Sequence, residues 1–190
     1  MPEKTLKNET VVVLGLGTNL GDRIAYLSEA VTLLASGTEP VLHSAKLSHI
    51  YESPALLLPG SPASWNKPFL NMAIAGTTTL TPEEMLETAK YIETVLGRQQ
   101  GERWAPREID IDILTWGEQV YTSSQLIIPH SQLLERDFAL LPLADIAPLW
   151  KCQTPGEYFG KTASEITFLR RGKSTTRRTA LTLNTPIHTV

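Results

Sequence analysis

The chain has 190 residues, is 42% hydrophobic and 19% charged, and carries a formal net charge of −3 at pH 7, an ordinary balance for a globular protein with a buried core. No apolar run approaches the ~20 residues that cross a bilayer. The first ten residues contain two acids and no apolar stretch, so we expect no signal peptide. The single cysteine, Cys152, excludes an internal disulfide and a cysteine-built zinc site, so we expect a cytoplasmic location.

The first quarter of the chain predicts a strand, a helix and a second strand. Residues 11–16 form an apolar, β-branched run that is typical of a buried strand. Turn-forming residues follow it, and Asp22 is one of the residues that can begin a helix there. Apolar residues then recur at helical spacing over 24–34. Residues 41–52 alternate loosely between apolar and polar, which favours a second strand.

Three glycines lie near the end of the first predicted strand. Gly15, Gly17 and Gly21 resemble a phosphate-binding loop, but no lysine follows them and the spacing matches neither nucleotide-binding pattern. A tight turn between strand and helix is therefore the preferred interpretation.

The middle of the chain continues with a long loop, a strand and a helix. Four prolines within residues 53–68 predict a loop, and loops of this length are often functional. Residues 69–79 have the composition of a third strand. Thr81, followed by proline and two glutamates, predicts a helix start, and the apolar spacing carries this helix to Gly97.

A fourth strand is predicted over 108–116, and residues 131–146 are mostly helical in pattern. The order strand, helix, strand, strand, helix, strand predicts the α+β class. We expect a ferredoxin-like βαββαβ sandwich, an antiparallel sheet with helices packed on one face.

Charge divides the chain unevenly. Residues 161–190 contain six Lys and Arg but a single acid, Glu165, whereas the preceding part is acidic. Basic tails can bind nucleic acid or an anionic membrane, but a solvated linker or frayed terminus is the simpler interpretation. We expect a flexible N-terminus over 1–10, one domain over 11–160, and a basic tail or linker over 161–190.

Two aspartates form the clearest candidate site. Residues 107–114 alternate polar and apolar, so on a strand Asp110 and Asp112 project from the same face. Neighbouring carboxylates repel unless a cation lies between them, and Mg²⁺ is bound through one or two carboxylates plus substrate phosphates. A solvated edge strand would show the same alternation. The metal interpretation is favoured because four arginines cluster nearby in an otherwise acidic region, at positions 98, 103, 107 and 136.

The stretch over 103–114, Arg-Trp-Ala-Pro-Arg-Glu-Ile-Asp-Ile-Asp-Ile-Leu, resembles the signature of the 6-hydroxymethyl-7,8-dihydropterin pyrophosphokinase family. Further matches to the family follow in the same order and span most of residues 11–150: they lie at 17–22, 51–54, 69–71, 97–98, 129–130 and 136–138.

The resemblance implies a folate-biosynthesis enzyme that transfers pyrophosphate from ATP to the hydroxymethyl group of the pterin and releases AMP. It implies two Mg²⁺ ions held by Asp110 and Asp112. The catalytic residues that it implies are Arg98, Arg107, Asp110 and Asp112. The implied ATP-binding residues are Glu93, Arg98, Trp104, Arg107, Ile113, His130 and Arg136. The implied pterin-binding residues are Ser53, Pro54, Leu56, Phe69, Asn71 and Phe138, with the pterin between the two phenylalanine rings.

The implied partners are two small molecules, ATP and the pterin, without nucleic acid or membrane, and relatives also occur fused to another folate-pathway enzyme. The chain departs from the family at Gln100, where an arginine is usual, and at Ala105, where glycine is usual. Gln100 leaves open a catalytically weak pterin-binding paralogue. A ferredoxin-like nucleic-acid-binding protein is a further alternative, disfavoured because the first strand lacks the exposed aromatics on which bases stack. The polar segment 97–106 is expected to close over ATP as a lid.

Overall fold

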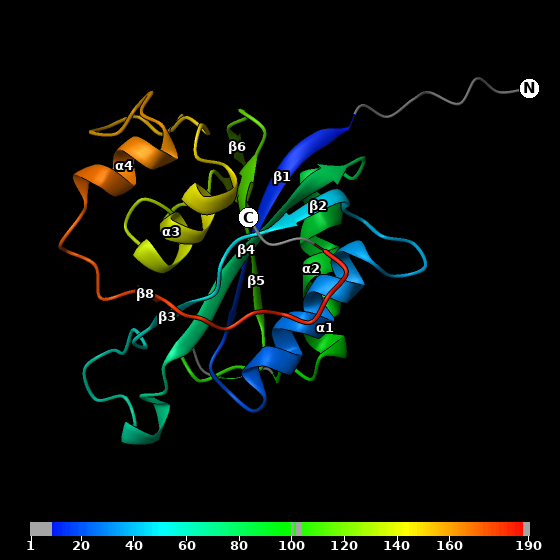
Figure 1. The fold of residues 1–190 in the computed structure, drawn as a ribbon, viewed down its shortest axis with the longest axis vertical. Helices are drawn as coiled ribbons and strands as arrows, with labels where there is room; N and C mark the ends of the chain where they lie inside the picture. Colours follow the sequence, from blue (N-terminus) through cyan, green and yellow to red (C-terminus); the bar gives the residue numbers. More distant parts are fainter. Residues whose placement is uncertain (1–8, 100, 102–103, 188–190) are drawn as a thin grey trace, which may run out of the picture.

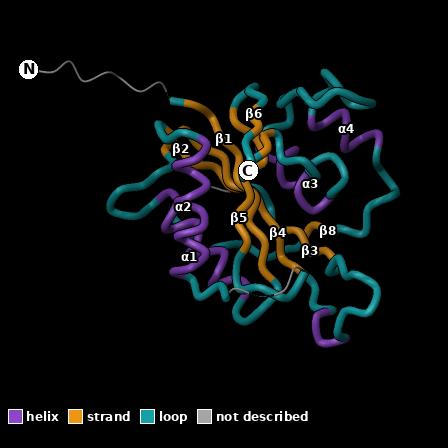
Figure 2. The backbone as a smooth tube through the Cα atoms, turned by 180° about the vertical axis from the view of Figure 1, so that it is seen from behind, coloured by secondary structure: helices purple, strands orange, loops and turns teal. Residues whose placement is uncertain are grey.

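The computed structural model describes residues 9–99, 101 and 104–187. An antiparallel sheet lies between two layers of helices (Figure 1). Helices α1 (Arg23–Ala35) and α2 (Pro82–Val95) cover one face, and α3 (Asp137–Ile146) and α4 (Ala163–Leu169) cover the other, as the reversed view also shows (Figure 2). The expectation of helices on one face only is therefore wrong.

The physical reason is that the strands are apolar on both faces. One core lies between the sheet and α1 and α2, and it includes Leu14 and Ile74. Their neighbours in sequence, Val13 and Ala73, point the opposite way and form a second core with Leu114 and residues of α3 and α4. A sheet that is apolar on both sides requires helices on both sides.

The main sheet has the strand order β5-β1-β4-β3-β8, with β2 also paired to β4, and all of these pairs are antiparallel. The bounds are β1 Thr10–Thr18, β2 His43–Leu47, β3 Tyr51–Ser53, β4 Phe69–Thr78, β5 Asp110–Trp116 and β8 Arg177–Arg178. A separate hairpin joins β6 (Tyr121–Thr122) to β7 (Ile127–Ile128), and the long loop contains a short 3₁₀ helix, η1 (Ala63–Trp65).

The strand expected over 41–52 is interrupted. Ser48 separates β2 from β3, because its hydroxyl donates to the carbonyl of His49 at 2.7 Å and accepts from the amide of Ala73 at 2.8 Å. The two halves continue along the same edge of β4.

Both predicted helix starts are confirmed. The amide of Ala25 donates to the Asp22 carboxylate, and Thr81 forms a reciprocal capping box with Glu84. Helix α3 begins later than the sequence pattern indicates, at Asp137, because turns occupy the residues before it. Helix α4 was not predicted, although Thr162 and Glu165 form a second capping box that could have revealed it.

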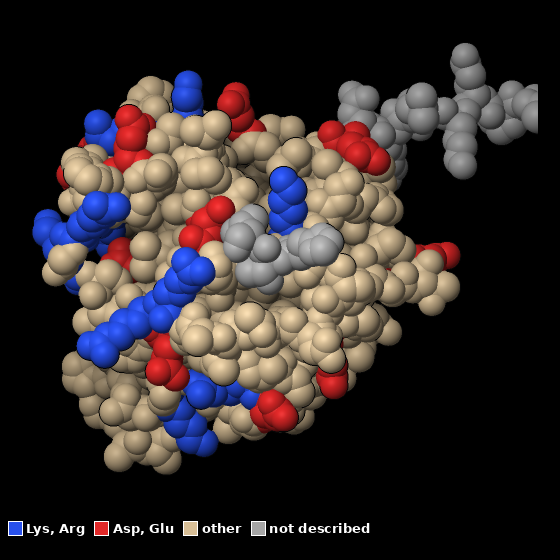
Figure 3. All heavy atoms as spheres, in the orientation of Figure 1, with Lys and Arg blue, Asp and Glu red and all other residues tan. Residues whose placement is uncertain are grey.

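The segment 161–190, expected to be a basic tail or linker, contains α4 and β8 within its described part. Lys and Arg side chains gather on the side of the molecule that carries these elements (Figure 3). Most of 1–10 lies outside the described residues, and β1 begins at Thr10. No helix in the described ranges is both long and apolar enough to span a membrane.

Candidate active site

Gly15 and Gly17 of β1 face the α3 side of the sheet and have no side chains there. We call this stretch of exposed backbone the floor. Gly17 stands opposite Asn71 of β4 and Asp110 of β5, and Gly15 stands opposite Asp112. A Cβ atom at Gly15 would lie 3.2 Å from the side chain of Leu114. Both glycines lie inside the strand, so they hollow the centre of the sheet and do not form a phosphate-binding loop. The tight turn that the sequence predicts comes afterwards, where Gly21 has a φ of 65°.

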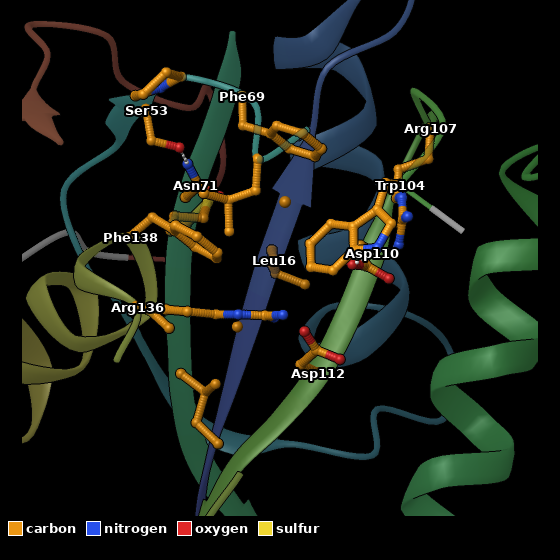
Figure 4. Close-up of a pocket in the computed structure, with 17 residues that line it drawn as sticks. Leu16, Ser53, Phe69, Asn71, Trp104, Arg107, Asp110, Asp112, Arg136 and Phe138 are labelled. Atoms are coloured by element: carbon orange, nitrogen blue, oxygen red, sulfur yellow. Dashed lines mark hydrogen bonds and ion pairs between the residues drawn. The ribbon is translucent and has the colours of Figure 1, made fainter. Parts of the chain in front are cut away.

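A cavity of about 190 Å³ opens above this floor. Its side chains converge from β1, β3, β4, β5 and the start of α3 (Figure 4). All six residues predicted to bind the pterin line it, together with five of those predicted for catalysis or ATP: these are Ser53, Pro54, Leu56, Phe69, Asn71, Phe138, Trp104, Arg107, Asp110, Asp112 and Arg136. Met72, Leu114 and Ala139 also line it and were not predicted.

The part of the cavity near β3 and β4 combines rings with a buried amide. Phe69 and Phe138 both point toward the cavity (Figure 4). Asn71 is 5% exposed, and its side-chain nitrogen donates to the Ser53 hydroxyl at 3.0 Å. The amide is therefore fixed in orientation, and aromatic surface next to a fixed donor and acceptor suits a flat heterocycle.

The two aspartates differ in their electrostatic environment. The Asp110 carboxylate lies 2.6 Å from a guanidinium nitrogen of Arg98 and 3.0 Å from one of Arg107. Burial alone would raise the pKa of Asp110, but the charges of Arg107 and Arg98 hold it below the ordinary value. For Asp112, burial and the neighbouring charge of Asp110 raise the pKa to about 6.

The carboxylate pair fits a divalent cation. Both aspartates line the cavity, and a cation between the two carboxylates would relieve the repulsion from Asp110 that, after burial, raises the pKa of Asp112. Among the described residues there is no group of three or more His, Cys, Asp or Glu that could hold a metal ion. The protein would therefore supply two carboxylates and the substrate phosphates and water the remaining ligands, which is the usual arrangement for Mg²⁺.

Glu93 and Arg98 lie behind the aspartates. Glu93 is 3% exposed and accepts a hydrogen bond from the amide of Ile111 at 2.8 Å, while Arg98 and Lys90 both pair with it. In the described part of the chain, neither Glu93 nor Arg98 is among the residues that line either cavity. The structure thus places Arg98 against Asp110. Glu93, on α2, connects that helix to β5 through its hydrogen bond with Ile111.

A second cavity, of about 310 Å³, lies on the other side of Asp112. Ile113 and His130, both predicted to bind ATP, line it. Asp112 lines both cavities, so the carboxylate pair stands where they meet. Sequence reasoning missed Lys90 and the polar residues of the β6–β7 hairpin, Ser123, Ser124 and Gln125. The spacing of Lys90 three residues before Glu93 on one helix was the only available signal.

His130 is held as a neutral imidazole. The amide of Gln132 donates to its Nδ1 atom at 3.2 Å, which requires that nitrogen to be unprotonated. Burial, followed by the charge of Arg136, lowers the pKa of His130. The ring therefore carries its proton on Nε2, which can donate to a ligand.

Arg136 stands between two aromatic rings at the edge of the first cavity. Its guanidinium carbon lies 5.8 Å from the centroid of Trp104 and 5.6 Å from that of Phe138. Trp104 has a φ of 75°, an unusual conformation for a residue with a side chain. Gln100 and Arg103, which belong to the predicted lid, lie outside the described residues.

Comparisons with known proteins agree with this geometry. The sequence model of the 7,8-dihydro-6-hydroxymethylpterin-pyrophosphokinase family matches residues 13–148. The chain is 42% identical over 137 residues to 2-amino-4-hydroxy-6-hydroxymethyldihydropteridine pyrophosphokinase of Aquifex aeolicus, covering 72% of this chain and 80% of that protein. It is also 41% identical over 158 residues to the folate synthesis bifunctional protein of Chlamydia muridarum, covering 82% of this chain.

The chain spans 34% of the length of that bifunctional relative. Its fold is similar to a crystal structure of a Plasmodium falciparum HPPK-DHPS triple mutant, with a TM-score of 0.66 at 17% identity over 91% of this chain and 45% of the other. The family match covers more than half of the residues and includes both cavities and the aspartate pair between them. The chain therefore belongs to the 7,8-dihydro-6-hydroxymethylpterin-pyrophosphokinase family.

Proposed function

We propose that the chain transfers the terminal pyrophosphoryl group of ATP to the hydroxymethyl oxygen of 6-hydroxymethyl-7,8-dihydropterin, giving AMP and the pterin diphosphate. The observation that carries the proposal is the position of Asp112, which lines both cavities. A substrate in each cavity would meet the other at the carboxylate pair. This arrangement suits transfer of a phosphorylated group between two bound molecules.

The pterin belongs in the first cavity. Phe69 and Phe138 supply two ring faces, and the fixed amide of Asn71 supplies a donor and acceptor for the edge of the heterocycle. Ser53 holds that amide in place through its 3.0 Å hydrogen bond. The hydroxymethyl group would then extend along the floor toward Asp110 and Asp112.

The nucleotide belongs in the second cavity. Ile113 offers an apolar surface, and His130 offers an Nε2–H donor, while Lys90 adds a positive charge at the same wall. The phosphates would lie near Asp112, within reach of cations from the first cavity, Arg107 and Arg136. Their guanidinium groups would hold the phosphate oxygens and offset the charge that develops during transfer.

Asp110 and Asp112 would hold Mg²⁺ together with the phosphates. When bound, Mg²⁺ offsets the charge of the phosphates and polarises the group under attack. Arg98 and Arg107 keep Asp110 ionised by lowering its pKa, and Glu93 fixes the β5 backbone beside it. Trp104 and Arg136 would exclude water from the edge of the first cavity.

We also propose that the fold contains a ferredoxin-like unit. The order β5-β1-β4-β3 is what a ferredoxin-like βαββαβ unit requires of its four strands, with α3 and α4 added on the second face. We further propose a short N-terminal segment over 1–10 and a pterin pyrophosphokinase domain over 11–160, to which 161–190 adds α4 and β8, and a cytoplasmic location based on the single cysteine.

The test is formation of AMP from ATP in the presence of the pterin and Mg²⁺. The proposal predicts AMP and pterin diphosphate in equal amounts. A catalytically weak paralogue would bind pterin without releasing AMP, so a binding measurement on the same sample separates the two functions.

A further inference from the structure

Arg170, the C-cap residue of α4, contacts the first residue of α3 and the chain just before it. Its Nε atom donates to the Asp137 carboxylate at 2.9 Å, and another guanidinium nitrogen lies 2.8 Å from the same oxygen. The Nη1 atom of Arg170 donates to the carbonyl oxygen of Leu134, and its Nη2 atom donates to that of Glu135. The side chains of Arg170 and Asp137 are 22% and 16% exposed, so this is a partly buried, charge-assisted contact.

The start of α3 carries two side chains of the first cavity. Arg136 is the N-cap residue of the helix and Phe138 lies in its first turn, and both line the cavity. The N-cap residue makes no side-chain capping hydrogen bond. The guanidinium of Arg170 therefore ties down a helix start that lacks the usual capping interaction.

The chain after Arg170 is anchored to β3, whose last residue, Ser53, also lines the first cavity. Arg177 and Arg178 pair with β3, which ends at Ser53. The amide and hydroxyl of Thr179 both donate to the carbonyl of Ile50, at 2.8 and 2.9 Å. Residues 170–179, which we call the clasp, thus join the start of α3 to the β3 edge, and Figure 1 shows this segment running from α4 to β3.

The other end of α3 has an independent attachment. The Asp145 carboxylate accepts from the amide of His49 at 3.1 Å and lies 2.9 Å from the His49 ring nitrogen. Asp145 also acts on β3: burial, and then the charge of Asp145, raise the pKa of the Tyr51 hydroxyl on that strand. Loss of Arg170 should therefore release the first turn of α3 without detaching the whole helix.

We propose that Arg170 is a positioning residue for pterin binding: from the clasp, it fixes the first turn of α3 and thereby sets Phe138 against the pterin. This inference rests on the proposed function, because it assumes that the first cavity takes the pterin. In the described part of the chain, Arg170 is not among the residues that line either cavity. It therefore acts through α3 and not on the ligand.

The experiment compares Arg170→Ala, Arg170→Lys and Arg171→Ala. Arg171 is the matched control, because it is the adjacent arginine and stacks on Phe168, which is 62% exposed. Arg170→Ala should raise the pterin dissociation constant about tenfold, the effect of roughly one lost charge-assisted hydrogen bond. The dissociation constant for ATP should rise by a smaller factor, because Arg136 is the one predicted nucleotide contact that lies at this helix start. Arg170→Lys should be intermediate, because an ammonium cannot reproduce the guanidinium contacts.

Hydrogen exchange in the unliganded protein gives a second reading. Amides of residues 137–141 should exchange faster in Arg170→Ala than in the wild type and the Arg171→Ala control. Unchanged exchange, or equal losses of pterin and ATP affinity, would overturn the positioning role. A wild-type protein that binds no pterin would contradict the proposed function instead, and the exchange data would still show whether Arg170 holds α3.

Discussion

Gly17 on β1 stands opposite Asn71 on β4, and a Cβ atom at position 17 would lie 3.4 Å from the side-chain oxygen of Asn71. The backbone of Gly17 thus borders the first cavity, and a larger residue there would reduce the volume of that cavity. Asn71 in turn is fixed by Ser53, so it cannot turn away without losing a buried hydrogen bond.

Gly17→Val should therefore block pterin binding while the sheet remains folded, because valine suits a strand and Gly17 has a negative φ. We expect at least about a tenfold rise in the pterin dissociation constant, since a Cβ atom at position 17 is already at van der Waals distance from Asn71 and Phe69, and the two methyl groups of valine extend beyond it. Calorimetric titration with pterin checks this. Gly37→Val, beyond the end of α1, is the control, and equal affinities in both variants would mean that Gly17 does not form the cavity floor.

Asp110→Asn and Asp112→Asn should each abolish turnover. Asparagine keeps the shape of the side chain but removes the charge that would hold Mg²⁺, and the loss of such assistance costs roughly a factor of 10³ or more. Initial rates at saturating Mg²⁺ provide the measurement, and Glu108→Gln, two residues before β5 and not among the described residues that line either cavity, should retain activity. More than about a tenth of wild-type activity in either aspartate variant would refute the metal assignment.

Asp112→Asn should also stabilise the metal-free protein at neutral pH. The pKa of Asp112 is raised to about 6 in the folded protein, against about 3.9 in an unfolded chain. A carboxyl whose pKa is higher in the folded state favours folding at low pH, and this contribution is lost as the pH rises from about 4 to about 6. Above that range, charging Asp112 costs at most about 3 kcal/mol, which asparagine avoids.

Thermal unfolding in the presence of a chelator checks this dependence. The Tm of the variant should exceed that of the wild type at about pH 7.5, and the difference should disappear below about pH 4. A variant less stable than the wild type at the higher pH would show that Asp112 is not strained by burial and by Asp110.

Phe69→Leu should weaken pterin binding and leave ATP binding nearly unchanged, because Phe69 lines only the first of the two cavities. Leucine keeps most of the buried apolar area but removes the ring face, which is worth about 0.5–1.5 kcal/mol beyond burial. The expected loss is about 2- to 12-fold in the pterin dissociation constant. A variant that unfolds at lower temperature but keeps its pterin affinity would identify Phe69 as a core residue.

The sequence predicted which candidate side chains lie together where one strand carries them. The period of two places Asp110 and Asp112 on one face without any tertiary information, and the family resemblance added the six pterin residues, all of which line one cavity. The role of Gly15 and Gly17 was not predictable, because only the pairing of β1 with β4 and β5 reveals that they hollow the sheet.

Contacts between distant segments were also beyond prediction. Arg170 and Asp137 are 33 residues apart, and nothing in a basic stretch distinguishes an arginine that contacts a helix from a solvated one. The short strands β6, β7 and β8 have two residues each, too few for a periodic pattern, so the second cavity and the clasp appear only in the folded chain.

The most direct test of the account is the analysis of nucleotide products from the wild-type protein with ATP, Mg²⁺ and 6-hydroxymethyl-7,8-dihydropterin. The proposed activity should give AMP and the pterin diphosphate in a one-to-one ratio, with no AMP when either the pterin or Mg²⁺ is omitted. Formation of ADP, or saturable binding of both substrates without AMP, would contradict it.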